Sequence, residues 1–173
     1  MDRIIERFLR YIAVDTKSSE EAEGTPSTPG QFTLAKMLRD ELLAMGAEDV
    51  FLDEHAYVYA KVPATSETGK KAAKIGFLAH LDTSPALDGK CEHPQFVDYK
   101  GGDITLGHGF VMREKEFPAL ANYQGKRLIM TDGSTLLGAD DKAGVAAAME
   151  LAQDLLEQRD IEHGDVFFAF CPD

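Results

Sequence analysis

Two short patterns in the sequence bring together residue types that bind metal ions. The first is H-L-D at positions 80–82, which follows an apolar run that begins at Ile75. Because alternate residues of a strand point the same way, His80 and Asp82 can project together at the carboxyl end of that strand. One ring nitrogen of His80 could then bind a cation while Asp82 accepts a hydrogen bond from the other nitrogen. An exposed histidine beside a turn-forming aspartate would produce the same three letters.

The second pattern is a pair of adjacent carboxylates, Asp140 and Asp141, in the segment LLGADDKAG. The pair stands at the predicted start of a helix, where aspartate is favoured as a cap and at the positive end of the helix dipole. Two aspartates followed by Lys142 and Gly144 are more than a cap requires, and carboxylate oxygens can bridge two cations. From these residues alone, a helix cap and a metal ligand both stay open as interpretations.

Several common catalytic motifs are absent from the sequence. It has no G-x-x-x-x-G-K-[ST] phosphate loop, no G-x-S-x-G elbow and no H-E-x-x-H zinc helix. Gly107-His108-Gly109 lacks the third glycine of a dinucleotide fingerprint, because Met112 occupies that place. Neither Cys91 nor Cys171 has a metal-ligand spacing. The two patterns above are therefore the remaining candidates for a catalytic or metal-binding site.

The overall composition narrows the class of protein and the class of partner. The chain has 173 residues, 44% of them hydrophobic, which suits one globular domain with a hydrophobic core. Its net charge of −12 argues against nucleic acid and anionic membranes as partners, since both are polyanions. No apolar run is long enough to span a bilayer, and the charged N-terminus does not look like a signal peptide. With two cysteines and no disulfide framework, we expect a cytoplasmic protein.

Hydrophobic periodicity predicts three helices that could position these residues. One is the amphipathic segment MDRIIERFLRYIAVDT at the N-terminus, and the others cover residues 29–45 and 142–157. For the helix at 29–45, Thr28 is expected to be the N-cap, with Gln31 completing a capping box. Each helix has one apolar stripe, so each should pack on a common core.

Apolar runs predict the strands, at residues 56–62, 74–80, 128–130 and 165–171. The strand at 74–80 is continuous enough to be buried on both faces. A strand, a crossover helix and another strand in this order predict an α/β fold with a parallel sheet and helices on its faces. The carboxyl edge of such a sheet is where ligands bind. Residues 84–127, rich in Gly, Pro and charge, should form a long surface excursion with weak strand tendencies near Ile104 and Phe110.

Four segments together resemble a known family: FLAHLDTSP, YKGGDITLG, TDGSTLLGADDKAG and HGDVFFAFCPD. In this order and spacing they resemble the M20 family of zinc metallopeptidases, and within it the tripeptide aminopeptidases. The resemblance runs from the first helix to the last residue. It implies a three-layer α/β/α catalytic domain with a mostly parallel central sheet. Residues 1–173 would be the N-terminal part of this domain, without the family's lid or dimerisation domain and its C-terminal catalytic segment.

The resemblance also implies roles for individual residues. His80 would be a terminal ligand on one of two Zn²⁺ ions, and Asp82 would be the catalytic-site carboxylate that orients this histidine. Asp140 would bridge both ions, and Asp141 would be the flanking residue that caps the helix. The family takes its general base and three further zinc ligands from segments that follow the position of Asp173. The 173-residue chain alone is therefore expected to be inactive.

For the intact protein, the resemblance implies zinc-dependent removal of the N-terminal residue from tripeptides, so the partners would be small peptide substrates. A homo-oligomer is one possible oligomeric state. Two alternatives stay open. Another M20 hydrolase, a dipeptidase or an amino-acid deacylase, would carry the same two patterns. A non-catalytic fold fragment or binding module would keep these residues without a competent site. A sheet that lacks its later strands would also expose an edge and apolar surface, so self-association is expected.

Overall fold

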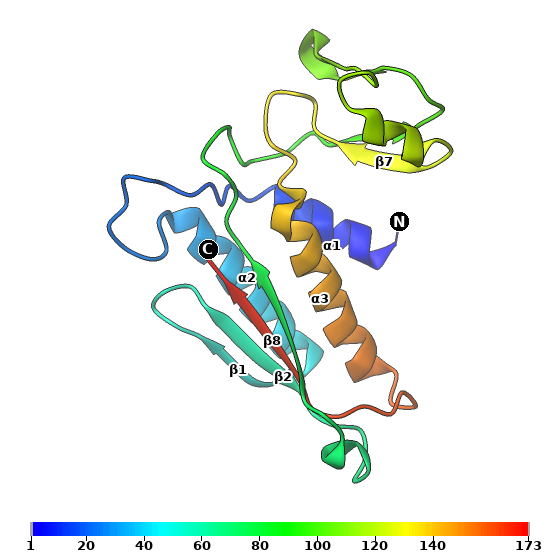
Figure 1. Ribbon diagram of the computed structural model, residues 1–173. Coiled ribbons are helices and arrows are strands. Elements are labelled where there is room, and N and C mark those ends of the chain that lie inside the picture. Colours follow the sequence, from blue (N-terminus) through cyan, green and yellow to red (C-terminus); the bar gives the residue numbers. More distant parts are fainter. Residues whose placement is uncertain (1, 173) are drawn as a thin grey trace.

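The centre of the structure is a four-stranded mixed sheet with the strand order β1-β2-β8-β3 (Figure 1). This computed structural model describes residues 2–172. The strands are β1 (Glu48–Leu52), β2 (Val58–Val62), β3 (Ile75–His80) and β8 (Val166–Cys171). β3 and β8 run parallel, whereas β1 with β2 and β2 with β8 run antiparallel. The predicted α/β class is confirmed, and the parallel pair carries His80 at its carboxyl end.

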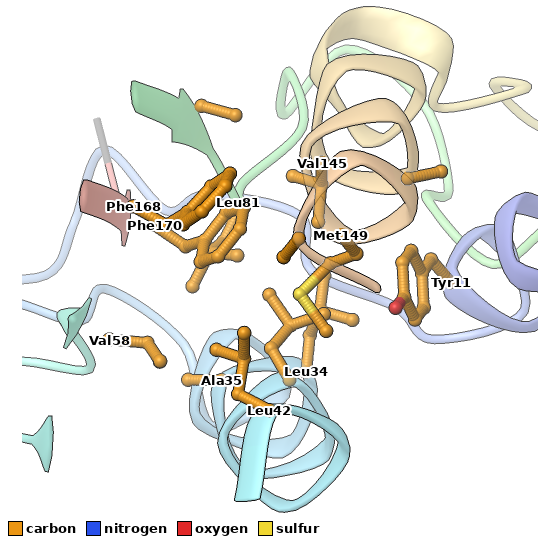
Figure 2. Packing of buried hydrophobic residues seen from close by; sticks show 14 of the residues in the cluster. Tyr11, Leu34, Ala35, Leu42, Val58, Leu81, Val145, Met149, Phe168 and Phe170 are labelled. Carbon is orange, nitrogen blue, oxygen red and sulfur yellow. The ribbon is translucent and has the colours of Figure 1, made fainter. Parts of the chain in front are cut away.

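Three helices lie on one side of this sheet: α1 (Arg3–Ile12), α2 (Pro29–Met45) and α3 (Ala139–Glu157) (Figures 1 and 2). α2 and α3 contact the strands, and α1 packs against α3. Figure 2 shows Leu34 of α2 and Met149 of α3 facing Phe168 and Phe170 of β8, and all four side chains are buried. Burying such a side chain stabilises the fold by roughly 1.5–3 kcal/mol. No helix within residues 2–172 is both long and apolar enough to cross a membrane.

The exposure of strand β3 corrects one prediction. The strand at 74–80 was expected to be buried on both faces, but Ile75, Phe77 and Leu78 are exposed, Leu78 by 72%. Among residues 2–172, β3 lies at the edge of the sheet, so Phe77 is partly exposed although it stacks on the buried Phe168 of β8, on the face that the helices cover. Leu78 points to the opposite face, which the helices leave uncovered (Figure 1). Two of the three predicted layers are therefore present in the described part of the chain. An apolar run indicates that a strand tends to be buried, but it does not indicate which element covers each face of that strand.

The excursion after β3 is more ordered than the sequence indicates. β4 (Gln95–Asp98) pairs with β7 (Arg127–Met130), and β5 (Ile104–Thr105) pairs with β6 (Val111–Met112). Three short 3-10 helices also occur, η1 (Gly69–Lys71) before β3, and η2 (Gly107–Gly109) and η3 (Pro118–Tyr123) within the excursion. The excursion has a small core of its own, formed by Tyr99, Ile104 and Leu120.

Strand β7 differs from its predicted place. It was expected to be the first strand of a crossover into residues 165–171, but it pairs with β4 outside the central sheet. The strand beside β8 is instead β3, which comes earlier in the chain. The parallel pairing is thus present, but the connection between its two strands includes the whole excursion as well as α3.

The start of α2 is where predicted, but the capping box is wrong. The Thr28 hydroxyl makes no cap hydrogen bond and donates instead to the carbonyl oxygen of Lys17, at 2.8 Å. The side-chain carbonyl of Gln31 accepts from the backbone N–H of Ser27, at 3.0 Å. Both side chains therefore hold the preceding loop against the helix. Their partners come from the tertiary fold, so a local pattern could not reveal them.

Candidate metal site

His80 is the last residue of β3 and lies beside Cys171 of the parallel strand β8. The pairing continues for one more residue, because the N–H of Leu81 donates to the carbonyl oxygen of Cys171 at 2.8 Å. Asp82 follows and is largely buried. Its backbone carbonyl oxygen is 3.1 Å from Nδ1 of His80, whereas its nearer carboxylate oxygen is 3.5 Å away. The expected neighbour is therefore present, but its carbonyl oxygen is the closer acceptor.

Asp140 stands at the entry to α3, on the other side of His80. Its backbone has φ −94° and ψ 102°, so the regular turns of the helix begin after Asp141. One carboxylate oxygen, Oδ1, is 3.1 Å from Nε2 of His80. The Asp140 side chain is 97% exposed and that of His80 29%. The two residues predicted to be metal ligands thus meet, although they are 60 positions apart in sequence.

Asp141 has a different environment from its neighbour. Its Oδ1 accepts a hydrogen bond from the N–H of Gly144, at 3.1 Å, which is the contact of an N-terminal helix cap. The approach depends on glycine, because a Cβ at position 144 would lie 2.3 Å from this oxygen. The prediction that Asp141 caps the helix is confirmed. Capping by Asp141 leaves the carboxylate of Asp140 directed toward His80.

The proton on His80 can be assigned from its two neighbours. A carbonyl oxygen only accepts, so Nδ1 carries the proton that is donated to Asp82. Nε2 then faces a carboxylate oxygen, and this contact is favourable only if Nε2 is also protonated or if a cation lies between them. Burial lowers the pKa of His80, but the hydrogen bond to Asp140 and the charges of Asp82 and Asp141 outweigh it, so the pKa is raised. The same carboxylates that favour a proton here would favour a metal ion.

Lys142 follows the two aspartates in the first turn of α3 and is completely buried. Its Nζ donates to the backbone carbonyl oxygen of Val14 at 2.7 Å. Burial lowers the pKa of Lys142 to about 8, against the opposing effect of the nearby Asp15 carboxylate. From the sequence, Lys142 stood out only as the residue that follows the pair Asp140 and Asp141, and its burial was not predicted. A signal was available, since residue 142 lies three and seven positions before Val145 and Met149, on the same buried stripe of α3.

The donor atoms of His80 and Asp140 suit Zn²⁺ in type and separation. Two ligands of a tetrahedral zinc, each about 2.0–2.1 Å from the ion, lie roughly 3.4 Å apart. The separation of 3.1 Å between Nε2 and Oδ1 is close to that value. A catalytic zinc uses about three protein ligands. Within residues 2–172, no group of three or more His, Cys, Asp or Glu side chains is arranged to hold an ion. The two residues fit a zinc site in chemistry, and the described residues are too few to complete it.

The sequence of this chain is similar to those of several known proteins. No protein-family model matches the chain. It is 50% identical over 170 residues to "Peptidase T" of Shouchella clausii (strain KSM-K16), covering 98% of this chain and 41% of that protein. The chain is thus similar in sequence to part of the proteins named peptidase T. It is also 51% identical over 173 residues to the peptidase T of Geobacillus thermodenitrificans (strain NG80-2), covering 98% of this chain and 42% of that protein. The chain spans about two fifths of the length of these relatives.

Solved structures share the fold of this chain at much lower identity. Human carnosine dipeptidase 1 superposes with a TM-score of 0.55 at 14% identity, over 97% of this chain and 31% of that one. The aminoacylhistidine dipeptidase of Vibrio alginolyticus gives a TM-score of 0.50 at 20% identity, over 98% and 27%. At these identities the likeness concerns the fold alone. It agrees with the α/β class that was predicted from the sequence.

Proposed function

We propose that the full-length gene product is a zinc-dependent aminopeptidase of the M20 family that removes the N-terminal residue from tripeptides. The observation that carries this proposal is the 3.1 Å contact between Nε2 of His80 and Oδ1 of Asp140 at the carboxyl end of β3. About 50% identity to proteins named peptidase T supports a peptidase activity. The tripeptide as substrate is inferred from the resemblance described above. Small peptides are thus the proposed partners.

Within this proposal, each residue of the site has a separate task. His80 would hold one Zn²⁺ through Nε2, and Asp140 would hold both ions of a two-zinc site through its two carboxylate oxygens. Bound zinc supplies a Lewis acid and lowers the pKa of a water molecule. Asp82 keeps the proton of His80 on Nδ1, through the carbonyl oxygen at 3.1 Å and with the carboxylate at 3.5 Å, so that Nε2 presents its lone pair. Asp141 fixes the first turn of α3, and with it the position of Asp140.

Other expectations from the sequence remain proposals. Residues 1–173 alone supply two of the ligands, so we propose that this segment does not hydrolyse tripeptides when zinc is added. The exposed edge strand β3 and its apolar residues support self-association of the same segment. A cytoplasmic location is supported by two cysteines that form no disulfide in the described structure.

A substrate panel on the full-length gene product tests the proposal. We expect hydrolysis of tripeptides at the first peptide bond, loss of activity after chelation with EDTA, and recovery when Zn²⁺ is restored. Preference for dipeptides or for N-acetylated amino acids would replace the tripeptide assignment with one of the other M20 activities. Zinc binding without hydrolysis of any of the three substrate classes would favour a binding module and overturn the proposed enzyme.

A further inference from the structure

The buried ammonium of Lys142 connects two parts of the candidate site. Lys142 belongs to the first turn of α3, two residues after Asp140. Lysine is almost never fully buried unless its charge is paired or hydrogen-bonded. Here Nζ donates to the carbonyl oxygen of Val14, at 2.7 Å, in the loop that follows α1. The start of α3 is thus tied to a loop that comes from the other end of the sequence.

The opposite side of this loop is bonded to the segment that follows β3. The N–H of Thr83 donates to the carbonyl oxygen of Thr16 at 3.2 Å, and the N–H of Ser18 donates to the carbonyl oxygen of Thr83 at 2.9 Å. These bonds form a short parallel bridge between Lys17 and Thr83. Thr83 directly follows Asp82. Residues 14–18 therefore lie between the chain segment of His80 and Asp82 and the helix start of Asp140.

Direct packing between these two segments is also close. A Cβ at Gly138 would lie 3.5 Å from the Cγ2 methyl of Thr83 and 3.7 Å from Nζ of Lys142. Gly138 itself has φ +75°, a conformation that other residues rarely adopt. Because Thr16 and Ser18 are hydrogen-bonded to Thr83, a shift of the loop would move Thr83 relative to the helix start. The separation of His80 and Asp140 would change with it.

We propose that Lys142 is a positioning residue, whose ammonium holds residues 14–18 in place and so sets the distance between His80 and Asp140. The proposal rests on the proposed function of these two residues as zinc ligands. Lys142 contacts neither of the candidate ligands in this role and acts through the loop. Substitution of Lys142 should therefore change the metal affinity and the coordination geometry more than it changes the stability of the fold.

The test is Lys142→Met in the full-length gene product, because methionine keeps an unbranched side chain of similar length and deletes the donor. We expect the affinity for Zn²⁺, measured by competition with a chromogenic chelator, to fall about 10–100-fold, as it does for residues that orient metal ligands. The absorption spectrum of the Co²⁺-substituted protein should also change. The decrease in kcat should be a larger factor than any change in KM. Lys142→Arg, which keeps a charged donor, should recover part of the zinc affinity.

A matched control is Met149→Ala, also fully buried on α3 but two turns further along the helix. It should lower the thermal unfolding midpoint and leave the zinc affinity of the folded protein unchanged. Equal losses of zinc affinity in Lys142→Met and Met149→Ala would overturn the proposal, since the effect would then follow stability alone. Unchanged zinc affinity and an unchanged Co²⁺ spectrum in Lys142→Met would overturn it as well.

A milder variant covers the case in which Lys142→Met does not fold. The Ser18 hydroxyl donates to the carbonyl oxygen of Thr83 at 3.1 Å, so Ser18→Ala weakens the other side of the same loop. It should lower the zinc affinity by a smaller factor, and no change would refute the positioning role. Failure of the proposed function is recognised separately, because the unmodified protein would then bind no Zn²⁺ or hydrolyse no peptide.

Discussion

Between α2, α3 and the sheet, large side chains such as Leu38 and Met149 are fully buried in one apolar core, whereas at the carboxyl end of β3 the buried Leu81 is joined by a set of backbone hydrogen bonds that fix the chain on either side of it. Apolar burial has no preferred direction and is shared among many residues. Hydrogen bonds depend on the distance and angle between one donor and one acceptor. Substitutions in the first region should therefore change the free energy of unfolding, and those in the second should change metal binding.

The largest effect should come from Asp140→Asn in the full-length gene product. An amide oxygen carries no charge and cannot bridge two cations as a carboxylate does, so we expect zinc affinity to fall by at least about 100-fold. Because the Asp140 side chain is 97% exposed, the free energy of unfolding of the metal-free protein should change by less than about 0.5 kcal/mol. Chelator competition and denaturant unfolding measure the two quantities.

The neighbouring carboxylate provides the control for this variant. Asparagine caps helices about as well as aspartate, so Asp141→Asn should keep both the stability and the zinc affinity. If both variants lost zinc binding equally, the two aspartates would not have the separate roles that their contacts indicate.

Leu38→Ala tests the apolar core, which is the first of these two regions. Leu38 is fully buried on α2, and its truncation should lower the free energy of unfolding by about 2–5 kcal/mol, through lost apolar contacts and the cavity left behind. Zinc affinity, measured where the variant is still folded, should equal that of the unmodified protein. A clear fall in affinity under those conditions would show that the two regions are coupled.

Gly30→Ala tests the contact between the start of α2, which belongs to the apolar core, and the loop after α1, which leads to the candidate site. A Cβ at position 30 would lie 1.7 Å from the carbonyl oxygen of Asp15, so the start of α2 or the loop after α1 must move. We expect a loss of stability of about 1–3 kcal/mol, measured by denaturant unfolding. Gly24→Ala is the matched control, because no atom lies within 4 Å of its added Cβ, and it should change stability by less than about 0.5 kcal/mol. Similar values for both variants would contradict the close contact.

The features that could be predicted are those that depend on neighbours in sequence. The stripe of α3 through Val145 and Met149 is buried as its period indicated, and the cap at Asp141 follows from its place before a helix. The strand β4 was missed because it has only four residues and gains its order by pairing with β7, about 30 positions later. The exposure of Phe77 depends on the position of β3 at the edge of the sheet, which only the tertiary fold decides.

In the candidate site, too, the features that depend on local sequence could be predicted, and those that depend on the tertiary fold could not. His80 and Asp140 were singled out by residue type and motif, and the structure brings them within hydrogen-bonding distance. Their roles as zinc ligands remain predictions. The closer contact of His80 with the carbonyl oxygen of Asp82 could not be foreseen, because it depends on how the chain turns after β3. The burial of Lys142 was overlooked because lysine is normally exposed.

Strand β8 lies between β2 and β3 in the sheet, although it follows both of them in the chain. Val58 of β2 is opposite Phe170, and His80 of β3 is opposite Cys171. During synthesis on the ribosome, the two earlier strands must therefore wait, with their inner edges unpaired, until the last of these three strands has emerged. Such long-range pairing slows folding. The histidine of the candidate site consequently reaches its final environment only after β8 has emerged, about 90 residues after His80 itself.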